Sequence, residues 1–211
     1  MKGRDEIMMK KRNLMHVVFL LDRSGSMSGS ESDTIGGFNS YIKKNKMKDY
    51  LVTTILFDDK YEKLYTCKHI SDVSELTTKE YYVRGSTALL DAVGKTINLM
   101  DHETKDKVLF VITTDGYENA SKEYNKEKIK EMIKAHKNYE FMYIGADIDS
   151  YSEASNIGIK RSNIANYKKD KKGINRMFDA VGMACEEYSC SSSIGSKWKK
   201  SLDEYVTNNE E

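Results

Sequence analysis

Runs of apolar residues alternate with amphipathic stretches along most of this chain. Six short runs rich in β-branched and aromatic residues predict strands, at residues 14–21, 51–57, 61–67, 107–114, 141–146 and 163–166. Between them, apolar residues recur at helical spacing and predict helices, at residues 33–42, 88–97, 124–136, 149–155 and 173–188. Asp33 or Thr34 is expected to cap the first of these helices.

This alternation predicts an α/β fold in which helices cover both faces of a mostly parallel sheet. The third strand is expected to be an exception. It follows the second strand after the turn Asp58-Asp59-Lys60, so we expect it to run antiparallel at the sheet edge. Parallel sheets bind ligands beyond the carboxyl ends of their strands, and candidate binding residues are therefore expected there.

Three oxygen-bearing side chains follow the first predicted strand. The strand ends at Asp22, and Ser24 and Ser26 follow at alternate positions of a turn that contains glycine. A carboxylate with two short hydroxyls suits a hard cation such as Mg²⁺ or Mn²⁺, whereas zinc prefers thiolate or imidazole ligands. The sequence therefore suggests a metal site beyond the carboxyl end of the first strand.

The pattern Asp-x-Ser-x-Ser resembles the first segment of the metal-ion-dependent adhesion site (MIDAS) of von Willebrand factor type A domains. That family also requires a threonine from a second loop and an aspartate after a later strand, and Thr87 and Asp115 occur in this order. The resemblance covers roughly residues 14–190. It extends to a group of compact bacterial and phage single-domain proteins over residues 19–27, 34–39, 82–92 and 111–121.

The resemblance implies a doubly wound six-stranded sheet in the order 3-2-1-4-5-6, which brings Asp22 and Asp115 together where the winding reverses. It also implies that the two serines coordinate the ion directly, that Thr87 does so directly or through water, and that the two aspartates hold water ligands. Ser86 could replace Thr87 if the loop shifts by one residue. Such a hydroxyl-rich site would leave one coordination position for an Asp or Glu of a partner protein.

Other catalytic motifs fail on their context. Gly94-Lys95-Thr96 matches the end of a P-loop, but Leu89 stands where the first glycine should be, and the tripeptide lies inside a helical pattern. A phosphatase with an aspartyl nucleophile would need an aspartate where this chain has Ser24. The histidines are isolated from one another, and we expect structural or surface roles for all four: His16, His69, His102 and His136.

Length and charge narrow the functional classes. With 211 residues, we expect one α/β domain at residues 14–190, an N-terminal extension at 1–13, and a tail at 191–211 with a short helix between Trp198 and Tyr205. The formal net charge of +1 gives no overall attraction to nucleic acid or membrane. No apolar run approaches the roughly 20 residues that a membrane helix needs.

The cysteines and the first residues bear on the compartment. Cys67, Cys185 and Cys190 are odd in number and lack Cys-x-x-Cys spacing, which favours reduced thiols in a cytoplasmic protein. No apolar core typical of a signal peptide precedes the first strand, so export is not expected. We therefore expect a cytoplasmic protein, and we expect it to be a monomer.

Charge is distributed unevenly along the chain. Residues 160–200 carry ten Lys or Arg against four Asp or Glu, for which a solvated helix face is the default interpretation and binding of an acidic partner or nucleic acid the alternative.

Without metal, Asp22 and Asp115 should repel each other. Five further acidic residues near the same edge are interpreted as caps and turn residues, although they could surround a metal with negative charge: Asp58, Asp59, Glu118, Asp147 and Asp149.

These observations predict a non-catalytic, Mg²⁺- or Mn²⁺-dependent module that binds a carboxylate of a partner protein. The alternative is a nucleic-acid-associated protein that uses a basic face and exposed tyrosines, and a Mg²⁺-dependent enzyme has less support. The predicted metal site consists of Asp22, Ser24, Ser26, Thr87 and Asp115.

Overall fold

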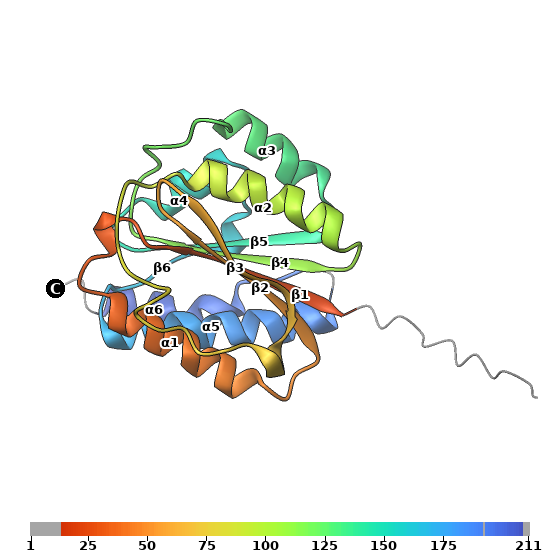
Figure 1. Ribbon diagram of the computed structural model, residues 1–211. Helices are drawn as coiled ribbons and strands as arrows, with labels where there is room; N and C mark the ends of the chain where they lie inside the picture. The colour runs from red at the N-terminus through yellow and green to blue at the C-terminus, as the bar shows by residue number, and fades with distance from the viewer. Residues whose placement is uncertain (1–13, 192, 209–211) are drawn as a thin grey trace, which may run out of the picture.

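A six-stranded sheet forms the centre of the computed structural model, which describes residues 14–191 and 193–208. The strands lie in the order β3-β2-β1-β4-β5-β6 (Figure 1), and β3 alone runs antiparallel to its neighbour. This confirms the predicted sheet. The strands are β1 (Met15–Asp22), β2 (Tyr50–Phe57), β3 (Tyr61–His69), β4 (Val108–Thr114), β5 (Tyr139–Gly145) and β6 (Ile164–Asn166).

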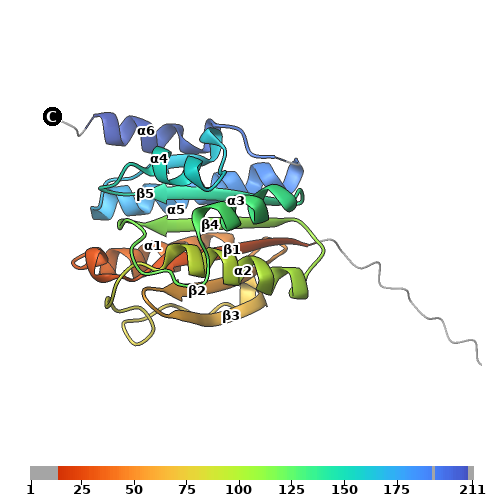
Figure 2. The same cartoon turned by 90° about the horizontal axis from the view of Figure 1, so that it is seen from above.

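Helices cover both faces of the sheet (Figures 1 and 2). One layer consists of α1 (Glu31–Asn45), α5 (Lys171–Cys190) and α6 (Lys200–Thr207), and the other of α2 (Leu89–Glu103), α3 (Lys126–Ala135) and α4 (Ser150–Asn156). Short 3₁₀ turns occupy Gly25–Met27, Ile70–Asp72, Arg161–Asn163 and Lys197–Lys199.

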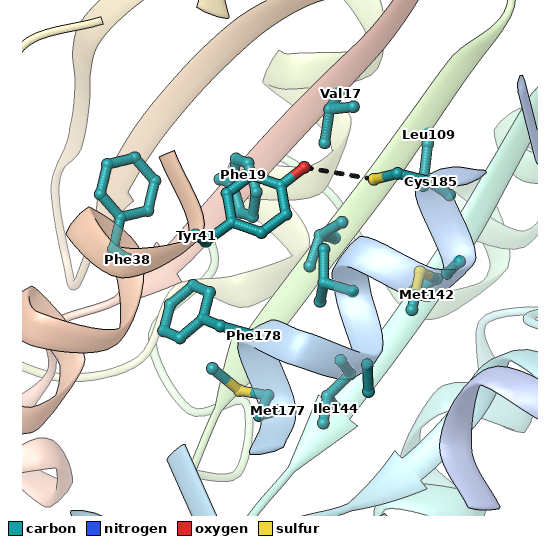
Figure 3. Close-up of a cluster of buried hydrophobic side chains, with 14 of the residues drawn as sticks. Val17, Phe19, Phe38, Tyr41, Leu109, Met142, Ile144, Met177, Phe178 and Cys185 are labelled. Atoms are coloured by element: carbon teal, nitrogen blue, oxygen red, sulfur yellow. Dashed lines mark hydrogen bonds between the residues drawn. The ribbon is translucent and has the colours of Figure 1, made fainter. Parts of the chain in front are cut away.

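Strand β1 lies at the centre of the sheet because its apolar residues can be buried on both faces. Every residue of β1 and of its neighbour β4 is buried. On one face, the Phe19 ring lies 5.4 Å from that of Phe38 and 5.1 Å from that of Tyr41 (Figure 3). On the other face, Phe110 stacks on Phe141 at 4.6 Å. The two apolar layers fix the strand that carries Asp22 at its end.

The first helix begins earlier than expected. It starts at Glu31, after Ser30, so the prediction that Asp33 or Thr34 caps it was wrong. Ser30 donates its hydroxyl to the Met27 carbonyl at 2.6 Å, which joins the helix start directly to the 3₁₀ turn after Ser24. Asp33 instead lies in the first turn, where a negative charge favours the helix dipole.

The C-terminal part of the described chain packs on the domain. Trp198 is 1% exposed and donates its indole N–H to the Ser162 carbonyl at 3.1 Å, and Leu202 of α6 is fully buried. The expected N-terminal extension at residues 1–13 lies outside the described residues, as do positions 209–211 of the acidic end. Within the described ranges, no helix combines the length and apolarity needed to cross a membrane.

Candidate metal centre

Asp22 is the last residue of β1 and is fully buried at the carboxyl end of the strand. Its Oδ1 accepts the Ser24 N–H at 2.7 Å, and its Oδ2 accepts the Thr114 hydroxyl at 2.6 Å. Burial raises the pKa of Asp22 to about 6, although these two hydrogen bonds oppose the shift. Both oxygens are thus fixed in orientation, and a nearby cation would favour the ionised form.

Ser26 connects the first loop to the end of β4. Its hydroxyl donates to Asp115 Oδ1 at 2.5 Å and lies 3.1 Å from the Ser24 hydroxyl. Asp115 follows β4, and β4 pairs directly with β1 in the sheet. The parallel pairing therefore brings together two segments that lie 89 positions apart in the sequence.

Thr87 completes the group of hydroxyls, and Gly116 shows how closely they converge. A Cβ atom on Gly116 would lie 2.8 Å from Thr87 Oγ1, 3.0 Å from Ser26 Oγ and 3.7 Å from Ser24 Oγ. Three hydroxyls thus surround one point that only a glycine leaves open. The structure brings all five predicted residues together, while their role as metal ligands stays a prediction.

Backbone contacts decide which residue of the second loop faces this point. Thr87 is 2% exposed, its N–H donates to Asn119 Oδ1 at 3.0 Å, and its carbonyl accepts the Asn119 N–H at 3.0 Å. Ser86 is exposed. Gly85 precedes it with a φ of +65°, a conformation that glycine adopts without strain. Thr87, rather than Ser86, is therefore placed to reach a bound ion.

A lysine that the sequence did not bring into the site pairs with Asp115. Lys169 Nζ lies 2.7 Å from Asp115 Oδ2, and the ammonium also donates to the Ser26 carbonyl. The Asp115 side chain is 1% exposed, so its charge is matched inside the protein. The expected repulsion between Asp22 and Asp115 is present, since burial and, to a smaller extent, the Asp115 charge raise the pKa of Asp22. Lys169 offsets part of it with a positive charge that the sequence did not indicate.

A buried ion network connects the loop that carries Ser24 with the loop that carries Thr87. Arg23 is fully buried, and its Nε donates to Asp58 Oδ2 at 3.0 Å. Arg84, next to Gly85, donates to the same oxygen at 2.7 Å. Burial opposes ionisation of Asp58, but the hydrogen bonds from Arg84 and the Lys60 N–H outweigh it and hold its pKa below the usual range. Asp58 is thus a turn residue, as expected, because its Oδ1 accepts the Lys60 N–H at 2.7 Å, and it is in addition a buried ion-pair partner.

The backbone joins the same two loops. Arg84 N–H donates to the Arg23 carbonyl at 2.9 Å, and Gly25 N–H donates to the Gly85 carbonyl at 3.1 Å. Tyr81 donates its hydroxyl to the Asp22 carbonyl at 2.5 Å. The loop that carries Thr87 is therefore attached directly to the loop that carries the serines.

The other acidic residues near this edge have local roles. Glu118 accepts the Leu90 N–H at 2.9 Å at the start of α2, and Asp149 accepts the Ser152 N–H at 3.0 Å at the start of α4. Asp149 is therefore the N-cap of α4, as expected, whereas Glu118 accepts an N–H of the first turn of α2 from a separate loop. Asp59 and Asp147 are exposed, and Asp147 has a φ of +55°.

The donor chemistry decides which ions fit these residues. The converging groups are hydroxyls and carboxylates, and hard cations such as Mg²⁺ and Mn²⁺ prefer such oxygens. Among residues 14–191 and 193–208, no group of three or more His, Cys, Asp or Glu side chains could hold a metal ion. The site therefore fits a cation bound largely through hydroxyls and water.

Sequence reasoning missed Lys169, Asn119 and the pairing of Asp58 with the two arginines. Asn119 lies four residues after Asp115, in a segment that the family resemblance covers. This position was the one feature of the sequence that could have indicated a role for Asn119 in the site. Lys169 follows the last strand of the sheet and was hidden among the basic residues of that region.

Solved structures resemble this fold. Proximal thread matrix protein 1 from the mussel byssus, with a zinc-occupied MIDAS motif, is 16% identical with a TM-score of 0.62, over 82% of this chain and 46% of that one. A von Willebrand factor type A protein from Catenulispora acidiphila is 13% identical with a TM-score of 0.57, over 78% and 41%. The ArnB paralog VWA2 from Sulfolobus acidocaldarius is 18% identical with a TM-score of 0.57, over 80% and 45%.

These similarities show that the chain has the von Willebrand factor type A fold. The chain spans less than half the length of each of these three structures. A scan against protein-family models finds no matching family, and a search of curated proteins finds no match.

Proposed function

We propose that this chain is a non-catalytic module that binds Mg²⁺ or Mn²⁺ and uses the ion to bind a carboxylate of a protein partner. The observation that carries the proposal is the convergence of the Ser24, Ser26 and Thr87 hydroxyls beside Gly116. Neutral hydroxyls withdraw little of the ion's charge, so the ion stays electrophilic toward a further carboxylate. The mussel protein's motif holds zinc, and zinc therefore belongs among the ions to be compared.

The exposure of the site supports a macromolecular partner. Ser26 is exposed, and so are Tyr117, which follows Gly116, and Tyr82, which precedes Arg84. Exposed tyrosines beside a binding centre are typical of protein interfaces. A hollow of about 620 Å³ lies elsewhere, between α5 and the segment that carries Trp198.

The positions of the histidines support a non-catalytic role. No histidine occurs in the loops at residues 22–30, 81–88 and 115–121. His16 lies six residues before Asp22 on β1 and contacts the Thr53 hydroxyl at 3.1 Å. A hydrolytic mechanism would need a general base within hydrogen-bond reach of the substrate, and the site loops offer no imidazole for this task. The carboxylates of Asp22 and Asp115 already accept hydrogen bonds or pair with Lys169.

Internal pairing argues against nucleic acid as the main ligand. Several of the ten basic residues between positions 160 and 200 have partners within the protein. Lys160 pairs with Glu140 at 2.6 Å, Lys169 pairs with Asp115 at 2.7 Å, and Lys199 donates to the Ile164 carbonyl at 2.7 Å. The local excess of charge is thus smaller than the sequence indicates, which favours the protein-binding proposal.

The compartment and the oligomeric state belong to the same proposal. Cys67, Cys185 and Cys190 are free thiols, as a reducing compartment would keep them. We accordingly propose a cytoplasmic location and a monomer, which size-exclusion chromatography with light scattering would check.

A capture experiment tests the partner-binding role. The protein is used as bait in lysate of the native host, with Mg²⁺ and then with EDTA. We expect at least one partner whose retention needs the metal and disappears when one Asp or Glu of that partner is replaced by Ala. A metal-dependent partner that binds equally well without any single carboxylate would contradict the proposed mechanism.

A further inference from the structure

Lys169 places an ammonium group on the candidate metal centre without being one of its predicted ligands. It lies between β6 and α5, beyond the carboxyl ends of the strands, as Asp115 does. Its Nζ is 2.7 Å from Asp115 Oδ2 and also donates to the Ser26 carbonyl. The Lys169 side chain is 22% exposed, and that of Asp115 is 1% exposed. The contact is therefore a largely buried ion pair, which is stronger than a surface pair.

The two oxygens of Asp115 face different groups. Oδ1 accepts the hydroxyl of Ser26, which also contacts the Ser24 hydroxyl, whereas Oδ2 faces Lys169. Oδ2 is buried and accepts no hydrogen bond of regular geometry among the described residues, so its contact with Lys169 is electrostatic. A cation bound among the hydroxyls and the ammonium of Lys169 can therefore share one carboxylate.

The backbone on both sides of Lys169 is fixed. Tyr167 N–H donates to the Gly145 carbonyl at 2.9 Å, which ties the preceding residues to the end of β5. Asp170 caps α5 by accepting the Gly173 N–H at 2.7 Å. The lysine thus extends toward Asp115 from a short segment that is anchored at both ends.

We propose that Lys169 is a resident counter-ion of the metal centre that weakens divalent-cation binding and favours binding of an external carboxylate; this rests on the metal site proposed above. Asp22 and Asp115 contribute two negative charges, and Lys169 contributes one positive charge. A divalent ion then leaves the centre with one net positive charge, which a partner's carboxylate neutralises. Without Lys169, the loaded centre would already be neutral and would attract a carboxylate less.

Calorimetric titration with Mn²⁺ tests the first half of this proposal. We expect Lys169→Met to bind Mn²⁺ about tenfold more tightly than the wild type, because a like charge beside the ion is removed. Lys169→Arg keeps the charge and should stay close to the wild type. Lys168→Met is the matched control, because it removes a neighbouring positive charge that is not paired with Asp115.

A measurement without any metal gives an independent readout. In EDTA, Lys169→Met should melt at a lower temperature than the wild type, because the buried Asp115 carboxylate loses its partner. Mn²⁺ should then raise the melting temperature of Lys169→Met more than that of the wild type. If Lys169→Met does not fold, Lys169→Gln, which keeps a hydrogen-bond donor for the Ser26 carbonyl, replaces it.

Acetate serves as the probe for the second half of the proposal, the binding of an external carboxylate. It is titrated into each Mn²⁺-loaded protein while the relaxation of water protons reports the water bound to Mn²⁺. We expect several-fold weaker acetate binding in Lys169→Met than in the wild type and in Lys168→Met.

The outcomes separate this inference from the proposed function. A wild-type protein that binds no Mn²⁺ contradicts the metal site itself. A wild type that binds Mn²⁺, together with unchanged or weaker binding in Lys169→Met, overturns only the role of Lys169. Tighter Mn²⁺ binding with unchanged acetate binding overturns its role toward the partner's carboxylate.

Discussion

Two neighbouring hydroxyl residues, Ser86 and Thr87, show how much a single position matters at the residue scale. The sequence left both as candidates, because a shift of one residue in the loop would exchange them. Thr87 is buried beside Gly116 and is bonded through its backbone to Asn119, whereas Ser86 is exposed. These contacts arise from a segment that lies about thirty positions further along the chain, and no local pattern predicts them.

The pair offers a direct mutational comparison. Thr87→Val keeps the shape of the side chain and removes the hydroxyl, so we expect Mn²⁺ affinity to fall about tenfold or more. Ser86→Ala removes an exposed hydroxyl and should leave the affinity unchanged. Calorimetric titration of both variants is the measurement, and a larger effect of Ser86→Ala would mean that the loop binds the ion in the other register.

A second prediction at this scale concerns His16 and pH. Burial lowers the pKa of His16 to about 4, so the folded state keeps this imidazole neutral. As the pH falls below about 6.5, the unfolded chain protonates His16 while the folded protein does not, and stability is lost until the pH reaches about 4. The expected loss is on the order of 3 kcal/mol.

Urea unfolding in EDTA at several pH values between 7 and 4 checks this. The dependence of unfolding free energy on pH should be weaker in His16→Gln by about one bound proton. His102→Gln changes an exposed histidine and serves as the control. Equal pH dependence in the wild type and His16→Gln would show that His16 does not contribute the effect.

At the scale of elements, the buried pairing of Asp58 with Arg23 and Arg84 joins the end of β2 to both site loops. The sequence predicted the β2–β3 turn correctly and treated Asp58 as part of it. It could not show that two arginines from other loops converge on this carboxylate, because Arg23 lies 35 positions before it and Arg84 lies 26 after it.

Asp58→Asn tests whether this network positions the loops. Arg23 is fully buried, so weakening its ion pair should reduce the free energy of unfolding by roughly 3 kcal/mol. Mn²⁺ affinity should also fall, because the segment around Gly85 loses its support. Asp179→Asn breaks the exposed pair with Lys44 and should change stability by less than about 1 kcal/mol. Unchanged Mn²⁺ affinity in Asp58→Asn would restrict the network to a purely stabilising role.

At the scale of the whole molecule, the topology was predictable and part of the site was not. The apolar runs that form β1 and β4 require burial on both faces, and the family resemblance supplied the sheet order that places Asp22 beside Asp115. Lys169 reaches Asp115 across 54 positions of sequence through a long, flexible side chain. Such a contact depends on the exact course of a loop, which the hydrophobic pattern does not determine.

The central claim is that a divalent cation binds among the hydroxyls beside Gly116. Its most direct test is the change in melting temperature caused by Mn²⁺ in the wild type, Gly116→Ala and Gly36→Ala. A Cβ atom on Gly116 would lie 2.8 Å from Thr87 Oγ1 and would crowd the hydroxyls that are proposed to hold the ion, whereas one on Gly36 in α1 meets nothing within 4 Å. Gly36→Ala should even stabilise the helix by about 0.5–1 kcal/mol.

At a hundredfold excess over Kd, Mn²⁺ should raise the melting temperature of the wild type and of Gly36→Ala by roughly 5 to 10 °C, and EDTA should reverse the change. Gly116→Ala should fold but show no response to Mn²⁺. A full response in Gly116→Ala, or none in the wild type with millimolar Mg²⁺ or Mn²⁺, would contradict the account.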